Sequence, residues 1–346
     1  MRTDEDAHDH AARAGPASPA SPGPQREWAR RPATVVARLR GRRVLVLSGR
    51  DLLRAAADEQ VLLVALVAPA AAAIAGFVRA ARDTGAPLLL SRPSGAADES
   101  GPEEARDDTA FVEAALQEAS ALSFPGPVAL FKDPPRVGSA VPDRDRVQRE
   151  LEAGFTSVAV TAQVDDAVAA RDAALISSQV CQREIGLELV PLGGSLSIAA
   201  EVAQQLMARG SFPSAIRLTG HEDEARAVLS QLGPVHISTA TETAPEGLLA
   251  QGVQLLIAAG PFVRALQKAA PREVLDELQA WADEKGASLE QAAARHQRLL
   301  RDLPRAALDR LEALSSFEAA ELFGRAKVGG TGARLAARVG TYSDEV

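Results

Sequence analysis

The sequence is poor in aromatic residues and in cysteine, and its net charge is not positive. Aromatic residues make up 3% of the 346 positions, so a hydrophobic core has to be built mainly from alanine, valine and leucine. Cys181 is the only cysteine, which excludes a disulfide within the chain and suits the reducing cytosol. The net charge of −8 excludes the generally basic surface with which proteins hold nucleic acids.

The sequence also lacks a hydrophobic run typical of a membrane-spanning helix. The apolar stretch 61–77 is interrupted by Pro69 and is just too short to cross a bilayer. Residues 1–25 combine charges with prolines and small residues and contain no apolar core of a signal peptide. We therefore expect a disordered tail at 1–25 and a cytoplasmic protein that binds neither membranes nor nucleic acids.

What the sequence does contain is a repeated alternation of short apolar runs with helix-length segments. The runs are rich in valine, leucine and isoleucine, as buried parallel strands are. We expect eight strands, at 61–67, 87–91, 127–132, 156–161, 185–190, 214–218, 234–238 and 254–259. This alternation predicts an α/β fold, a (β/α)8 TIM barrel over residues 26–261.

The chain continues beyond the expected barrel with a different pattern. Residues 262–325 are almost continuously helical in character, so we predict a helical extension that packs on the barrel or on a second subunit. The remainder, 326–346, is predicted to be a flexible tail. Its glycine cluster at 329–332 follows no clear strand and is more typical of a turn than of a phosphate-binding loop.

Four titratable residues are candidates for chemistry, because catalysis in such a barrel takes place at the carboxyl ends of the strands. Asp133 follows the third expected strand, Glu188 lies in the fifth, His221 follows the sixth and His236 lies in the seventh. If they meet at one rim, two imidazoles and a carboxylate could bind a divalent metal, and the second carboxylate could transfer a proton. A structural role remains an alternative for each of them. His236 could be a core histidine and His221 an exposed histidine at a helix start. Glu188 could be a buried carboxylate with a structural partner, and Asp133 could simply form a turn.

Short motifs occur in a fixed order over about residues 60–270. They are an apolar strand leading into Asp133, Ala-Gly-Phe-Thr at 153–156, Ile-Gly-Leu-Glu at 185–188 followed by Pro191 and a glycine pair, His-Ile-Ser-Thr at 236–239, and Gly-Pro at 260–261. In this order they resemble the class II sugar-bisphosphate aldolase superfamily. The similarity is strongest to the Z-type subunit of tagatose-bisphosphate aldolase.

This resemblance implies a carbon–carbon lyase of carbohydrate metabolism that acts on a ketose phosphate or bisphosphate. It places Asp133 at the proton-transferring position, and it places Glu188, His221 and His236 at the zinc-binding positions. The positions that it assigns to substrate and phosphate are Gly193, Gly194, Ser238 and Thr239. Pro134 stands where a zinc-ligating histidine is expected, so the resemblance also implies impaired zinc catalysis.

Two alternatives to a zinc-dependent lyase follow from these departures. Pro134 and the long helical region favour a non-catalytic barrel that stabilises or regulates a partner enzyme, as a homo-oligomer or as a hetero-oligomer with a catalytic aldolase subunit. A metal-independent lyase that forms a Schiff base on Lys132 is the other alternative. Because side chains alternate along a strand, only one of Lys132 and Asp133 is expected to point into the barrel.

Overall fold

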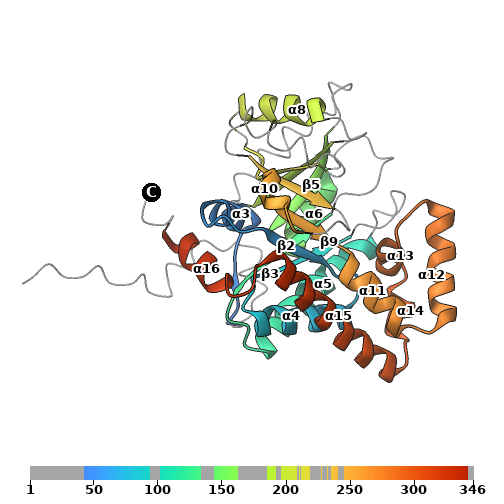
Figure 1. The fold of residues 1–346 in the computed structure, drawn as a ribbon. Coiled ribbons are helices and arrows are strands. Elements are labelled where there is room, and N and C mark those ends of the chain that lie inside the picture. Colours follow the sequence, from blue (N-terminus) through green and yellow to red (C-terminus); the bar gives the residue numbers. More distant parts are fainter. Residues whose placement is uncertain are drawn as a thin grey trace, which may run out of the picture.

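The structure, a computed structural model, describes residues 43–93, 102–133, 144–162, 185–191, 196–208, 210, 212–218, 227, 232, 235–240 and 245–341. Eight parallel strands follow one another around a ring that closes where β2 pairs with β9 (Figure 1). The strands are β2 (Leu63–Val67), β3 (Leu88–Arg92), β4 (Pro127–Lys132), β5 (Ser157–Ala162), β6 (Gly186–Pro191), β7 (Ala215–Arg217), β8 (His236–Ala240) and β9 (Val253–Ala258). The predicted TIM barrel is therefore confirmed, and each expected strand lies within two residues of an observed one.

Helices cover the outside of this ring, and small aliphatic side chains fill the space between the two layers. The helices that alternate with the strands are α4 (Ala71–Thr84), α5 (Pro102–Ala121), α6 (Arg144–Ala153), α8 (Leu196–Ala208) and α10 (Leu248–Gln251). Helix α4 ends at Gly85, whose left-handed φ of 69° lets its N–H reach the last carbonyl groups of the helix. Among the residues that the structure describes, only a few aromatic rings are fully buried, including Phe77, Phe155 and Phe262, as the composition predicts.

The amino end of the barrel is closed by segments from both ends of the described chain. The short strand β1 (Leu45–Val46) pairs with the start of β4, and α3 (Gly49–Asp58) then crosses the strand starts. Helix α16 (Gly332–Thr341) packs against α3, with Leu335 and Val339 buried in the same cluster as the inner barrel residues. The segment expected to be flexible at 326–346 thus contains a helix, because two apolar side chains spaced i, i+4 form one buried face.

The C-terminal region continues the helical layer. It comprises α11 (Gly260–Ala269), α12 (Arg272–Lys285), α13 (Leu289–Arg295), α14 (Gln297–Arg301) and α15 (Arg305–Ala326). Helix α15 lies against α4 and α11, and a Cβ at Gly76 would come within 2.4 Å of the carbonyl oxygen of Glu312, so only glycine fits at that crossing. Buried Glu318 binds Arg264 and Lys268 of α11, each at 2.6 Å. These contacts attach α15 firmly to the barrel, whereas the division of the chain into domains stays a prediction.

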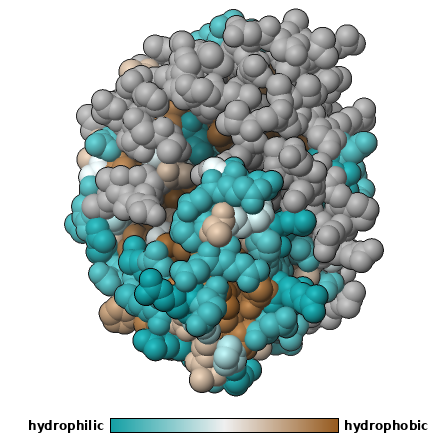
Figure 2. All heavy atoms as spheres, turned by 90° about the vertical axis from the view of Figure 1, so that its right-hand side faces the viewer, coloured by the Kyte–Doolittle hydropathy of each residue, from teal (hydrophilic) through white to brown (hydrophobic). Residues whose placement is uncertain are grey.

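The surface on this side of the molecule is mainly hydrophilic where it is described (Figure 2). Hydrophobic side chains reach the surface in a narrow strip in the lower half of this face, between hydrophilic ones. In the described part of the chain, no helix combines the length and the apolar character needed to span a lipid bilayer.

Candidate functional site

Two of the predicted site residues, Asp133 and Glu188, meet inside the barrel toward its carboxyl end. Glu188 is buried in β6 between Leu187 and Leu189, which belong to the hydrophobic layer outside the strands. The alternation of strand side chains therefore turns Glu188 inward. Asp133 directly follows β4 and shares a face with Phe131, which is one of the hydrophobic side chains that fill the inside of the barrel. The two carboxylates are thus brought together by the inward faces of different strands.

Arg217, a residue that the sequence analysis did not select, joins these two carboxylates. Its Nε donates to Glu188 Oε1 at 3.1 Å, and its Nη2 donates to Glu188 Oε2 at 2.5 Å and to Asp133 Oδ1 at 2.8 Å. The hydroxyl of Ser238 donates to the same Glu188 Oε1. Arg217, Glu188, Asp133 and Ser238 form a network that we call the inner cluster.

Charge attraction holds the guanidinium of the inner cluster in its protonated form. Burial alone would lower the pKa of Arg217, but the nearby carboxylates of Glu188 and Asp133 outweigh this effect and raise it above its ordinary value. One sequence signal could have revealed the residue. Arg217 ends a buried strand and lies two positions after the inward-facing Ala215, so it had to point into the barrel and needed a partner there.

His236 lies away from the inner cluster, toward the amino end of the barrel. It is the first residue of β8, two positions before Ser238 on the same face, and Asp58 at the end of α3 acts on it electrostatically. Burial lowers the pKa of His236, and the charge of Asp58 opposes this shift in part. The observed strand begins two residues later than expected, at 236 instead of 234, which places His236 at the start of its strand instead of near the rim.

The other predicted site residues have different positions. The Ser238 hydroxyl is used within the inner cluster, and Thr239, although predicted to contact substrate or phosphate, is fully buried on the opposite face of β8. Lys132 points out of the barrel, where its Nζ donates to Asp108 of α5 at 2.8 Å. A Schiff-base lysine inside the barrel is therefore not provided by Lys132. The remaining predicted residues lie outside the described part of the chain: Pro134, Gly193, Gly194 and His221.

A small cavity of about 170 Å³ opens above the inner cluster at the carboxyl end of the barrel. Asp133 contributes to its lining together with apolar residues at the strand ends, namely Val67, Pro93, Ala240, Ile257 and Ala259. Glu290 and Gln291 of α13 complete this lining. The C-terminal region therefore forms part of the wall of the barrel mouth, and the described wall carries two carboxylates.

The described residues of this site do not fit a divalent metal ion. The oxygen atoms of Glu188 that would bind a metal accept hydrogen bonds from Arg217 and Ser238, and Asp133 also binds Arg217. A guanidinium placed between the two carboxylates repels a second cation. No group of three metal-ligating side chains occurs among the residues that the structure describes.

Comparison with known proteins finds similarity at the level of the fold. No protein-family model matches the sequence, and no curated protein matches it. The YdjI aldolase from Escherichia coli K12 superposes with a TM-score of 0.58 and 12% identity, over 83% of this chain and 99% of that one. The fructose-bisphosphate aldolase from Campylobacter jejuni superposes with a TM-score of 0.53 and 11% identity, over 82% and 96%. The chain is therefore a TIM barrel with the fold of these aldolases.

Proposed function

We propose that this protein is a degenerate relative of the class II aldolases that has lost metal-dependent cleavage and acts as a non-catalytic barrel. In this role it stabilises or regulates a partner enzyme of carbohydrate metabolism in the cytoplasm, as a subunit of an oligomer with a catalytic aldolase. The observation that carries the proposal is the guanidinium of Arg217 between Asp133 and Glu188.

A metal ion could use these carboxylates only after Arg217 had been displaced. The displaced guanidinium, whose side chain is 9% exposed, would then lose its carboxylate partners, and breaking a buried ion pair in this way costs about 3–5 kcal/mol. The inner cluster thus favours the arrangement without metal. Among the described residues, this ion cluster supports the loss of zinc catalysis that Pro134 led us to expect.

The mouth cavity supports the same proposal. Its volume of about 170 Å³ is below the roughly 300–1,000 Å³ of ordinary small-molecule pockets. Asp133 and Glu290 give its described lining an acidic character, which is unfavourable for a phosphate group. A sugar phosphate as the ligand of this mouth therefore has little support from the described lining.

Two measurements on the purified full-length chain test the proposal. We expect no bound zinc by elemental analysis and no cleavage of fructose 1,6-bisphosphate or tagatose 1,6-bisphosphate, with or without added zinc. We also expect a tagged chain, purified from its native cells, to retain an aldolase in a fixed ratio whose activity or stability falls when the chain is removed. Zinc-dependent cleavage by the chain alone would contradict the loss of catalysis, and recovery of the chain by itself would contradict the supporting role.

A metal-independent sugar-phosphate lyase is the second candidate, because Asp133 lines the mouth cavity with 16% of its side chain exposed. Such a carboxylate can act as a general acid or base. Cleavage that persists in a chelator and is abolished by Asp133→Asn, but not by the exposed control Asp276→Asn, would establish this activity. Absence of cleavage under these conditions would eliminate it.

A further inference from the structure

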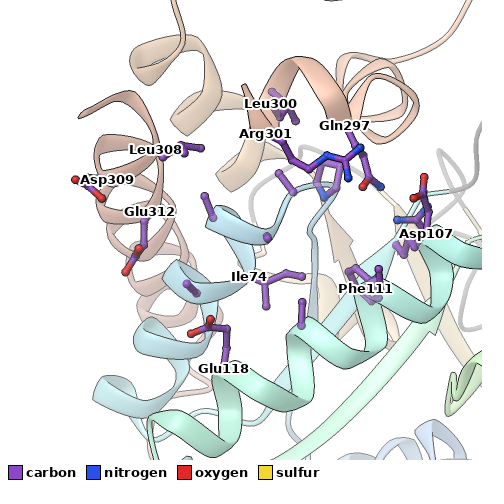
Figure 3. A pocket seen from close by; sticks show the side chains of 18 of the residues that line it. Ile74, Asp107, Phe111, Glu118, Gln297, Leu300, Arg301, Leu308, Asp309 and Glu312 are labelled. Carbon is purple, nitrogen blue, oxygen red and sulfur yellow. The ribbon is translucent and has the colours of Figure 1, made fainter. Parts of the chain in front are cut away.

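A second and larger cavity lies outside the barrel wall, between α4 and α5 of the barrel and α14 and α15 of the C-terminal region (Figure 3). Its volume of about 630 Å³ falls within the range typical of small-molecule sites, roughly 300–1,000 Å³. None of its lining residues lines the mouth cavity, so it is separate from the candidate site described above. We call it the outer cavity.

Most of the wall of the outer cavity is apolar. Alanines of two helices, such as Ala75 of α4 and Ala114 of α5, keep the space open because their side chains are short. Ile74 and Phe111 lie along the same wall, and Leu300 and Leu308 face them from the C-terminal region (Figure 3). An apolar ligand body would be removed from water here, at a gain of about 25 cal/mol per Å² of buried surface.

A buried arginine contributes a fixed positive charge to this cavity. Arg92 is only 3% exposed, and its Nε donates to Asp108 at 2.5 Å. Asp108 is itself held by Lys132, and the guanidinium carbon of Arg92 lies 6.0 Å from the centre of the Phe111 ring. The Nη2 atom of Arg92 also forms a long ion pair with Asp107, which lines the same cavity, at 3.9 Å from Oδ2. The guanidinium is therefore oriented before a ligand arrives.

The polar groups of the cavity are distributed unequally. Gln297, Arg301 and the carboxylate of Asp107 lie toward one end, whereas Glu118, Asp309 and Glu312 lie toward the other (Figure 3). Glu312 is paired with Arg79 at 2.6 Å. The first turn of α4 also borders the cavity, and its N-cap Ala70 has no side-chain acceptor for the backbone N–H groups. A helix start of this kind adds positive potential.

We propose that the outer cavity binds a small organic anion. Its acidic group would lie between Arg92 and Arg301, and its apolar body would lie along Phe111 and Ile74. Charge-assisted hydrogen bonds to arginine fix the acidic group, and the apolar wall selects ligands with a hydrophobic part. Because Arg301 belongs to α14 and Arg92 to the barrel, a bound anion would hold the C-terminal helices against the barrel.

Titration of the full-length protein with 8-anilinonaphthalene-1-sulfonate tests this proposal, because the probe combines a sulfonate with an aromatic body. We expect saturable binding of one probe per chain. Arg301→Gln should weaken this binding about tenfold or more, as the loss of a charged hydrogen bond implies. Ala114→Leu should weaken it by a similar factor without removing any charge, because it fills the cavity and leucine is a good helix former.

Arg298→Gln is the matched control, since Arg298 lies on the same helix but is 89% exposed and is not part of the cavity lining. It should leave probe affinity within about twofold of the wild type, in line with the small effect of exposed charges. Circular dichroism and the unfolding midpoint establish that each variant is folded. Equal affinities of the wild type, Arg301→Gln and Ala114→Leu, or several weak sites in place of one, would overturn the proposal.

Discussion

The two faces of strand β4 carry charge clusters of opposite design. Inside the barrel, one cation, Arg217, lies between two carboxylates, those of Asp133 and Glu188. Outside it, one carboxylate, Asp108, lies between two cations, those of Arg92 and Lys132. We call this second group the outer cluster.

The two clusters are joined by consecutive residues, Lys132 and Asp133, which alternate across the strand. The charges at the barrel mouth are therefore balanced in the same way as those in the barrel wall. Each cluster is built around one central group of opposite sign to its neighbours. The inner cluster therefore resembles a structural ion cluster more than a set of free metal ligands.

Removal of the central cation of the inner cluster should have the largest effect. Arg217→Met leaves two buried carboxylates without their guanidinium, and we expect the free energy of unfolding at pH 8 to fall by about 3–5 kcal/mol. Urea denaturation measures this, with the exposed Arg272→Met as the control. A loss below about 1 kcal/mol would mean that the network is not structural.

Removal of the central carboxylate of the outer cluster tests whether stability depends on the central charge there as it does in the inner cluster. Asp108→Asn retains the shape of the side chain but leaves two buried cations close together. We expect a loss of about 3 kcal/mol in the free energy of unfolding. Urea denaturation measures this loss. A loss below about 1 kcal/mol would show that the outer cluster does not depend on the charge of Asp108.

Loss of one carboxylate of the inner cluster should have a smaller effect than loss of its cation. Glu188→Gln retains the size of the side chain, and Arg217 keeps its 2.8 Å hydrogen bond to Asp133. We therefore expect a decrease of about 1.5–3 kcal/mol, the range for a hydrogen bond to a charged group. The same urea titrations give this value. A decrease as large as that of Arg217→Met would contradict the central role of the arginine.

Replacement of His236, at the other end of the barrel, should change the free energy of unfolding by a smaller amount that depends on pH. Burial lowers its pKa below the ordinary value of 6.5, with partial opposition from Asp58. The unfolded chain therefore binds a proton that the folded chain rejects, and stability falls as the pH drops below that ordinary value. His236→Gln should lose less stability than the wild type between pH 7.5 and pH 5.5. Equal losses, measured by denaturation at both pH values, would contradict the burial of a neutral ring.

The fold was largely predictable from the sequence, because buried parallel strands are apolar along their whole length. The run 127–132 was placed at its observed bounds for this reason. The tail was harder to predict, since α16 is a short helix and its apolar face is completed only by contact with α3. Tertiary contact, which local sequence does not display, decides such a segment.

The candidate site was predictable only in part. Asp133 and Glu188 bind the same arginine inside the barrel, so the expectation that they lie close together agrees with the structure, whereas their roles in catalysis and metal binding stay predictions. His236 was placed too near the rim, because a shift of two residues in the start of β8 changes its height in the barrel. Arg217 lies within the expected strand 214–218, where alternation turns it inward. It was missed because its partners, Glu188 and Asp133, come from distant parts of the chain, and local sequence does not display their pairing.

A crystal structure of the full-length protein, grown with excess zinc, would show directly whether arginine or metal occupies the barrel. We expect the guanidinium of Arg217 to remain between Asp133 and Glu188, with the Nη2 to Asp133 hydrogen bond near its present 2.8 Å and no metal on either carboxylate. A zinc ion bound to Glu188 or Asp133, with Arg217 turned away from them, would contradict it.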